Sequence, residues 1–222
     1  MNERILIVCA HIDDETLGCG GTILKHVYHG DIVHVLVITD SCSTQYMNND
    51  KAMIKQKHNE ANKAMHILGV KSIEFNSLPD MQLDTVPHVE INRIIEDKIR
   101  RFKPTIVYTH HWGDINKDHR LVSEATMVAI RPIPEQTIKK IYTYEVPSST
   151  EWSVEPYKTF MPNTYVDITE FMPILNAAVK CYKTELRRYP HPRSVESMGY
   201  TRNGIQVGIR YVERFHLVRS VE

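Results

Sequence analysis

The stretch ILIVCAHIDDE, residues 5–15, places an imidazole and adjacent carboxylates directly after a run of aliphatic side chains. The aliphatic run predicts a strand covered on both faces, and the polar residues then stand where this strand ends and a helix begins. In an open α/β sheet, ligands bind at the carboxyl ends of the strands. Two neighbouring acids buried there need a cation or hydrogen-bond donors to compensate their charge. We therefore expect a metal site that residues from further along the chain complete.

Composition limits the classes of protein that this chain can be. Its 222 residues fit one domain, and 27 Lys and Arg balance 27 Asp and Glu, so no overall field favours a nucleic-acid partner or an anionic membrane. No apolar run approaches the roughly 20 residues of a transmembrane helix, and no signal peptide is apparent. The four cysteines, Cys9, Cys19, Cys42 and Cys181, lack disulfide-type spacing. This pattern is typical of free thiols in the cytoplasm, although a ligand role for the first two stays open.

Strand-like and helix-like segments alternate through the first two thirds of the chain. We expect strands at residues 4–9, 31–39, 72–75, 105–109 and 141–146, and helices at residues 18–29, 51–68, 87–102 and 121–130. Successive βα units of this length predict an α/β fold of the Rossmann-like kind. Such a fold has a mostly parallel, doubly wound sheet with helices on both faces.

The whole chain, residues 1–222, is expected to form a single domain, because no repeat, low-complexity tract or linker divides it. The core of this domain spans about residues 3–146. The tail, residues 147–222, is expected to add loops and three elements: strands at residues 165–168 and 209–218 and a helix at residues 170–187. A long irregular segment of this kind is typical of the wall of a functional site.

A second polar cluster, residues 110–119, follows the predicted strand 105–109 and precedes a helix. In a parallel sheet, this cluster and the first one occupy the same edge and can converge. His11, Asp14 and His119 would then supply two imidazole nitrogens and one carboxylate oxygen. That donor set is usual for catalytic zinc, which keeps one position open.

Asp13 lies between two of these expected ligands and cannot easily coordinate the same ion. Because zinc lowers the pKa of water to about 7, a nearby carboxylate can act as a general base at neutral pH. The alternative is that the acids at residues 13–15 only cap a helix and complement its dipole. The second His/Asp cluster at the equivalent position argues against that alternative.

The residues of both clusters carry a family resemblance. Residues 10–15 resemble the Ala-His-Pro-Asp-Asp-Glu motif of the LmbE/PIG-L-like zinc-dependent N-acetylglucosamine deacetylases, with Ile12 in place of the proline. The match continues through residues 16–22, and Asp118-His119 resembles the second motif of the family. The resemblance covers about residues 3–130, and the tail is similar to a subset of the family more loosely, at residues 191–194 and 207–215.

The resemblance implies that His11, Asp14 and His119 bind one Zn²⁺ per chain and that Asp13 is the general base. It also implies that Asp118 orients a neighbouring group. The implied reaction is hydrolysis of the N-acetyl group of an amino sugar or glycoconjugate, which releases acetate and a free amine. A small-molecule substrate is therefore expected, and because relatives often assemble, a homo-oligomer stays open.

Asn116 departs from the family pattern, because well-known members have a histidine there that is proposed to stabilise the oxyanion or protonate the leaving amine. An amide donates a hydrogen bond but delivers no proton at neutral pH. Either Asn116 only stabilises the oxyanion, or another residue is the acid. The alternatives for the acid are protonated Asp13 and three histidines, His110, His111 and His191.

Substrate contacts must also be reassigned, because the loop after the second predicted strand lacks the arginine that some members carry. Tyr46 lies in that loop, and His191, Arg193 and Arg202 lie in the tail. We expect Tyr46, His191 and Arg193 to contact substrate, with Arg202 as an alternative. Arg193 could bind a phosphate or a carboxylate.

Three other functions fit parts of the pattern. A dinucleotide site is disfavoured, because acids occupy the position where the phosphates would bind. A metal-dependent amidase acting on a non-sugar amide stays open. So does a sugar- or nucleotide-binding protein whose metal is structural.

Overall fold

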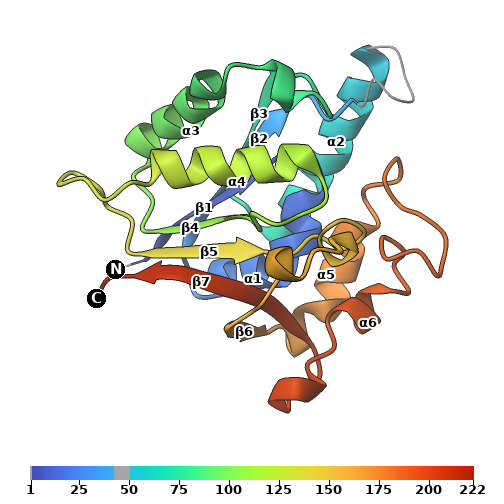
Figure 1. Ribbon diagram of the computed structural model, residues 1–222. Coiled ribbons are helices and arrows are strands. Elements are labelled where there is room, and N and C mark those ends of the chain that lie inside the picture. Colours follow the sequence, from blue (N-terminus) through green and yellow to red (C-terminus); the bar gives the residue numbers. More distant parts are fainter. Residues whose placement is uncertain (1, 43–50) are drawn as a thin grey trace.

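One mixed sheet organises the chain in the computed structural model, which describes residues 2–42 and 51–222. Within these ranges, seven strands pair in the order β3-β2-β1-β4-β5-β7-β6 (Figure 1). The strands are β1 (Arg4–Cys9), β2 (Ile32–Thr39), β3 (Ser72–Leu78), β4 (Ile106–His110), β5 (Lys140–Tyr144), β6 (Thr164–Asp167) and β7 (Val212–Ser220). All neighbours from β3 to β5 are parallel, and β7 runs antiparallel to both β5 and β6. The predicted mostly parallel α/β fold is confirmed.

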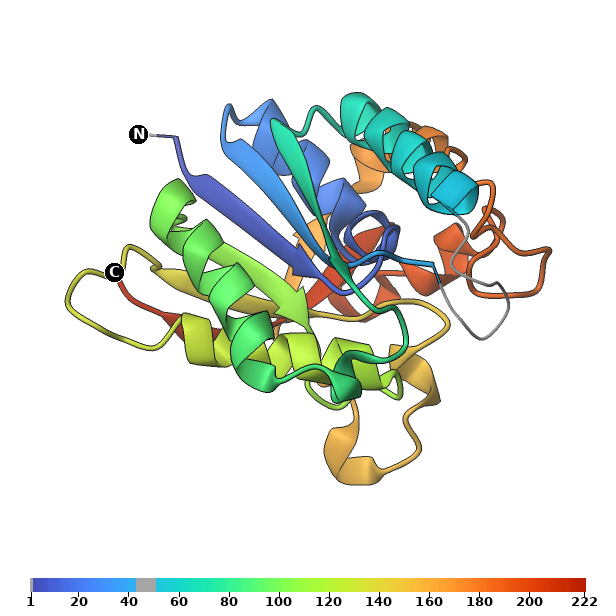
Figure 2. The same cartoon turned by 90° about the horizontal axis from the view of Figure 1, so that it is seen from above.

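Two layers of helices cover the sheet on opposite faces (Figure 2). The main helices are α1 (Asp14–Tyr28), α2 (Lys51–Leu68), α3 (His88–Phe102), α4 (Lys117–Ala129) and α5 (Met172–Val179). Side chains alternate between the faces along β1, because successive residues of a strand point to opposite sides. Ile5 and Ile7 belong to the core beneath α1, α2 and α5, whereas Leu6 and Val8 belong to the core beneath α3 and α4.

The order of the strands creates a crevice at the carboxyl ends of β1 and β4. These two strands are neighbours, but the chain passes from β1 outward to β2 and from β4 outward to β5, on opposite sides. Ligands bind in α/β sheets at such a switch point. The two polar clusters follow β1 and β4 directly, so both lie at this crevice, as the sequence predicts.

Helix α1 begins at Asp14, so the prediction of a helix that begins at residue 18, with the glycines Gly18, Gly20 and Gly21 in its first turn, is wrong. Those glycines lie inside α1, where they let it pack closely against its neighbours. A Cβ at Gly18 would lie 2.4 Å from Tyr144 Cδ2, and one at Gly20 would lie 2.4 Å from Leu175 Cδ1. The glycines therefore allow close packing of α1 beside the crevice.

Helix α4 also begins earlier than predicted, at Lys117 instead of residue 121. The side chain of Asn116 accepts a hydrogen bond from the Asp118 backbone N–H at 2.9 Å and caps the helix. Asp118 and His119 consequently lie in the first turn of a helix rather than in a loop.

The tail completes one edge of the sheet with β6 and β7 and adds the short helix α6 (Met198–Thr201). Helix α5 ends at Val179, so the prediction of a helix to residue 187 is wrong. Beyond α5, carboxylates of α1 and α2 bind this segment. The Thr184 backbone N–H donates to Glu60, and the Tyr182 hydroxyl donates to Glu15. Among the described residues, no helix is both long and apolar enough to cross a membrane.

Candidate metal centre and catalytic pocket

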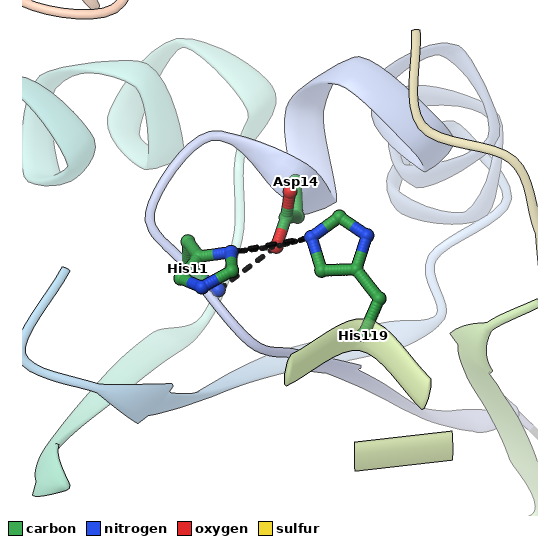
Figure 3. Close-up of side chains that lie close together, drawn as sticks. All are labelled: His11, Asp14 and His119. Atoms are coloured by element: carbon green, nitrogen blue, oxygen red, sulfur yellow. Dashed lines mark hydrogen bonds and ion pairs between the residues drawn. The ribbon is translucent and has the colours of Figure 1, made fainter. Parts of the chain in front are cut away.

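His11, Asp14 and His119 converge at the crevice, and Figure 3 shows both imidazole rings directed toward one carboxylate oxygen. His11 Nδ1 lies 3.2 Å from His119 Nε2. Each of these nitrogens lies 3.4 Å from Asp14 Oδ2. Asp14 and His119 are fully buried, and His11 is partly buried. The three residues predicted from the two clusters are therefore brought together.

The chemistry of this donor set fits a divalent cation. One ligand atom from each of the three side chains lies within 4.8 Å of the others. Asp14 Oδ1 is buried without a hydrogen-bond partner among the described residues, which is costly unless a positive charge lies nearby. Burial opposes the charged imidazole of His119, yet Asp14 and Asp114 raise its pKa to about 9. Two nitrogens and one oxygen suit zinc.

His119 is oriented through its second ring nitrogen. Its Nδ1 lies 3.2 Å from Asp114 Oδ2. The hydroxyls of Ser149 and Thr150 donate to the same carboxylate. Burial disfavours the charged form of Asp114, but the charge of His119 and these hydrogen bonds hold its pKa well below the usual range. A carboxylate that accepts Nδ1–H leaves Nε2 free to bind a metal.

His11 is held in the complementary way, through Nε2. This nitrogen lies 3.0 Å from Asp80 Oδ1 and 3.2 Å from Asp118 Oδ2. The backbone N–H groups of Met81 and Leu83 also donate to Asp118 and fix its position. The lone pair of His11 Nδ1 is thereby left for a cation between His119 and Asp14. His11 Nε2, Asp80 and Asp118 also have the spacing of metal ligands.

Asp13 occupies the turn between β1 and α1 in a left-handed backbone conformation, with φ of 97°. Its backbone N–H donates to Glu15 Oε2 at 3.2 Å, and buried Glu15 is itself bound by Tyr182. Arg193 Nη1 lies 3.2 Å from Asp13 Oδ2. Burial raises the pKa of Asp13, and the charge of Arg193 opposes that rise. Glu15 therefore supports the turn.

Ile12, which replaces the family's proline, has a partner that proline could not bind. Its backbone N–H donates to Ser41 Oγ at 2.8 Å. Proline lacks this donor, so the hydrogen bond exists only because of the substitution. The bond joins the metal-site turn to the end of β2.

Asn116 lines the same pocket as Asp13. Its Oδ1 is engaged in capping α4, so its Nδ2 group is the part left to donate toward the pocket. Nδ2 lies 3.6 Å from Met81 Sδ at the rim. The side chain is therefore presented as a neutral hydrogen-bond donor.

The three alternative histidines differ in their surroundings. His110 is buried and its Nε2 accepts the Ala10 backbone N–H at 2.9 Å, and burial lowers its pKa to about 4. His111 Nε2 lies 2.7 Å from the backbone oxygen of Lys158. His191 is the one of the three that lines the pocket, and its Nδ1 accepts the Arg193 backbone N–H at 3.1 Å. That hydrogen bond holds His191 as a neutral imidazole with Nε2 as its donor.

The pocket lined by His11 and Asp13 has a volume of about 590 Å³. Its lining includes His191 and Arg193, two of the three residues expected to contact substrate. The third, Tyr46, lies outside the described residues. The alternative contact Arg202 is wrong, because its side chain is buried beside Glu213 and donates to the Leu17 backbone oxygen.

Two carboxylates of the site, Asp80 and Asp114, received no role from the sequence. Asp80 follows β3 at the same edge of the sheet, and that position after a strand was the available signal. Asp114 lies within the second polar cluster, but nothing in the sequence shows which acid of a loop faces inward. Cys9 and Cys19 are buried and belong to neither group of metal-type side chains found among the described residues.

The family model described as PIG-L: GlcNAc-PI de-N-acetylase matches residues 6–130, a span that includes both polar clusters and more than half of the chain. The chain belongs to the PIG-L family. The expected resemblance is confirmed.

Three relatives of this chain are named as deacetylases. Uncharacterized deacetylase YaiS of Escherichia coli (strain K12) is 32% identical over 195 residues, which are 82% of this chain and 93% of the relative. Probable N-acetyl-alpha-D-glucosaminyl L-malate deacetylase 2 of Bacillus anthracis is 24% identical over 83% of this chain and 82% of the relative. Diacetylchitobiose deacetylase of Thermococcus kodakarensis is 26% identical over 82% of this chain and 70% of the relative.

Solved structures share the PIG-L fold along the whole chain. The zinc-inhibited form of teicoplanin deacetylase Orf2 superposes with a TM-score of 0.80 at 16% identity and covers 99% of both chains. GalB, the 4-carboxy-2-hydroxymuconate hydratase of Pseudomonas putida KT2440, has a TM-score of 0.77 at 23% identity. The match covers 99% of this chain and 98% of the GalB chain. Because one neighbour is a hydratase, the fold alone does not fix the reaction.

Proposed function

We propose that the chain is a zinc-dependent hydrolase that removes the N-acetyl group from an N-acetylated amino sugar or glycoconjugate. The observation that carries this proposal is the placement of Asp13 beside the donor group His11, Asp14 and His119, at the switch point of a PIG-L fold. The names of the relatives support an amino-sugar substrate. We further propose that the protein works in the cytoplasm and binds a single Zn²⁺ per chain.

His11 Nδ1, His119 Nε2 and Asp14 Oδ2 would hold the zinc. When bound, zinc supplies Lewis acidity that polarises the amide carbonyl and lowers the pKa of water. Asp114 would keep His119 in the tautomer that ligation needs, and Asp80 and Asp118 would do the same for His11. These carboxylates would position the ligands rather than touch the substrate.

Asp13 would transfer the proton. It would take a proton from the attacking water as the new C–O bond forms at the acyl carbon. When the C–N bond breaks, Asp13 would return that proton to the amine nitrogen, and the acid and the free amine leave. This double role fits a pocket in which Asn116 and His191 are neutral donors. Asn116 Nδ2 would donate to the developing oxyanion, and His191 Nε2 to a substrate hydroxyl.

Arg193 would hold Asp13 rather than bind the substrate directly. Its Nη1 faces Asp13 and Glu185, and its Nε donates to Ser148 Oγ at 2.7 Å. Two of the three guanidinium nitrogens, Nη1 and Nε, therefore already have acceptors. This assignment departs from the expected phosphate or carboxylate contact.

The test is acetate release from a panel of N-acyl amines by metal-loaded protein. The proposal expects release from N-acetylglucosamine derivatives, loss of release after chelation, and recovery with added zinc. A metal-dependent amidase would instead prefer non-sugar amides in the same panel. A binding protein with a structural metal would bind amino sugars without releasing acetate from any member.

A further inference from the structure

A second hollow, of about 620 Å³, is lined by residues of α2, by the end of α5 and by the segment that follows α5. Its lining comprises Ala52, Lys55, Gln56, Asn59, Glu60, Lys63, Ala177, Lys180, Cys181 and Lys183. We call it the lysine hollow. Its volume lies within the range of small-molecule sites, and none of its residues lines the metal pocket.

The lysine hollow carries a local excess of positive charge. Lys55, Lys63, Lys180 and Lys183 are all exposed, and in the described ranges none of these four ammonium groups lies in an ion pair. By contrast Lys57, which lines the metal pocket, is paired with Glu185 at 2.7 Å. The lysine excess is therefore local, because the chain as a whole has equal numbers of acids and bases.

The single carboxylate of the lysine hollow is already engaged. Glu60 is 6% exposed, and its Oε2 accepts from the Thr184 hydroxyl at 2.7 Å and from the Thr184 backbone N–H at 3.2 Å. Its Oε1 accepts from Gln56 Nε2 at 3.1 Å. Glu60 thus joins α2 to the tail instead of pairing with the lysines.

The cations come from two segments and converge on one space. Lys55 and Lys63 lie on one face of α2, and Lys180 and Lys183 follow α5 in the tail. Burial raises the pKa of the Cys181 thiol, and the charges of Lys63 and Lys183 oppose that rise, so both segments act on the same side chain. Four like charges brought together repel one another, and an anion between them would relieve that repulsion.

We propose that the lysine hollow binds a soluble ligand that carries neighbouring phosphate groups, such as a diphosphate. Lysine ammonium groups bind phosphate oxygens as compact charges, and the amides of Gln56 and Asn59 can add hydrogen bonds. Glu60 is the single carboxylate that lines the lysine hollow, and it is bound by Thr184 and Gln56. The four lysines therefore leave the hollow with a strongly positive net charge. The proposal is independent of the deacetylase reaction, because no lining residue belongs to the metal pocket.

Calorimetric titration with sodium diphosphate tests the proposal on the full chain. We expect saturable binding, weakened at least about tenfold in the double variant Lys63→Glu/Lys180→Glu. The charge-matched double variant Lys71→Glu/Lys139→Glu should bind as the wild type does. Because diphosphate can also chelate zinc, His119→Ala is titrated in parallel and should retain the binding. No saturable binding, equal weakening in both double variants, or loss of binding in His119→Ala would overturn the proposal.

Cys181 provides a second measurement inside the lysine hollow. It is the one cysteine of the chain that is not buried. Diphosphate should slow its alkylation by iodoacetamide severalfold, and Cys181→Ser should remove the label. Unchanged alkylation at saturating diphosphate contradicts the proposal. Circular dichroism confirms that each variant is folded, and acetate release should be unaffected by Lys63→Glu/Lys180→Glu.

Vesicles distinguish a soluble ligand from a membrane surface. Vesicles of phosphatidylcholine and phosphatidylglycerol should not compete with diphosphate for the wild-type protein. If the protein sediments with these vesicles through Lys63 and Lys180 but does not bind diphosphate, the occupant is a membrane and the proposal is wrong.

Discussion

Arg193 Nη1 lies 3.2 Å from Asp13 Oδ2, although 180 residues of sequence separate the two side chains. The contact brings the tail onto the turn that carries the metal site. It also places a permanent positive charge beside the carboxylate proposed to transfer the proton. The tail is thus a wall of the pocket and supports its chemistry.

Replacing Arg193 with glutamine should lower kcat by about 10²-fold while zinc is retained. The reason is that Asp13 loses the group that fixes its carboxylate, and small misplacements of a reacting group cost about this much. Arg187→Gln is the matched control, because Arg187 lines the same pocket but its Nη1 donates to backbone oxygens. Steady-state acetate release and metal analysis are the measurements. A kcat for Arg193→Gln equal to that of the control would refute the positioning role.

Replacing Asp114 with asparagine should weaken zinc binding by about 10- to 100-fold, because the carboxylate that orients His119 is lost. The affinity is measured by competition with a chromophoric chelator. Asp84→Asn is the control, since Asp84 forms an exposed ion pair with Lys117 away from the site. If both variants bind zinc equally well, Asp114 has no part in holding His119.

Replacing Glu213 with alanine should destabilise the fold by about 3–5 kcal/mol, because it leaves Arg202 buried and unpaired. The carboxylate also accepts the backbone N–H groups of Gly21 and Thr22 at 2.8 Å and 2.7 Å. The free energy of unfolding from urea denaturation is the measurement. Asp84→Ala should change it little, because surface ion pairs contribute little. Equal effects of the two variants would show that the buried pair does not support α1.

The stability of the fold should decrease as the pH falls from 6.5 to 4, in part because of His34. Burial, together with the charges of Lys98 and Arg4, lowers its pKa to about 4. In this pH window the unfolded chain takes up a proton that the folded chain does not, so unfolding is favoured as the pH falls. His34→Phe keeps a ring against Phe102, on which His34 stacks at 3.9 Å, but cannot take up the proton.

The free energy of unfolding of the wild type and of His34→Phe is measured by urea denaturation at pH 7 and at pH 5. The wild type should lose more stability between these values than His34→Phe does. An equal loss in both chains would mean that the folded protein accepts the proton on His34 as readily as the unfolded chain.

The central strands and the edge of the sheet that binds ligands could be predicted from the sequence, because aliphatic runs mark buried parallel strands. β1 matches residues 4–9, and α2 matches residues 51–68. His11, Asp14 and His119 were predictable for the same reason, since polar residues after neighbouring parallel strands meet.

The tail could be predicted only in part. The strands expected at residues 165–168 and 209–218 correspond to β6 and β7, but the rest of the tail depends on partners far along the chain. Helix α5 ends at Val179, where local periodicity alone favours continuation, since Tyr182 and Thr184 bind Glu15 and Glu60. The orientation of Arg193 toward Asp13 depends on the same packing. Local sequence carries no sign of such long-range contacts.

Asp13 is proposed to transfer the proton when this site hydrolyses an N-acetyl amide with a bound metal. The most direct measurement is acetate release by Asp13→Asn beside wild type, with zinc quantified in both proteins. We expect Asp13→Asn to retain zinc and to lose most of its acetate release on an N-acetylated amino sugar. Full acetate release by a zinc-loaded Asp13→Asn would show that Asp13 does not transfer the proton.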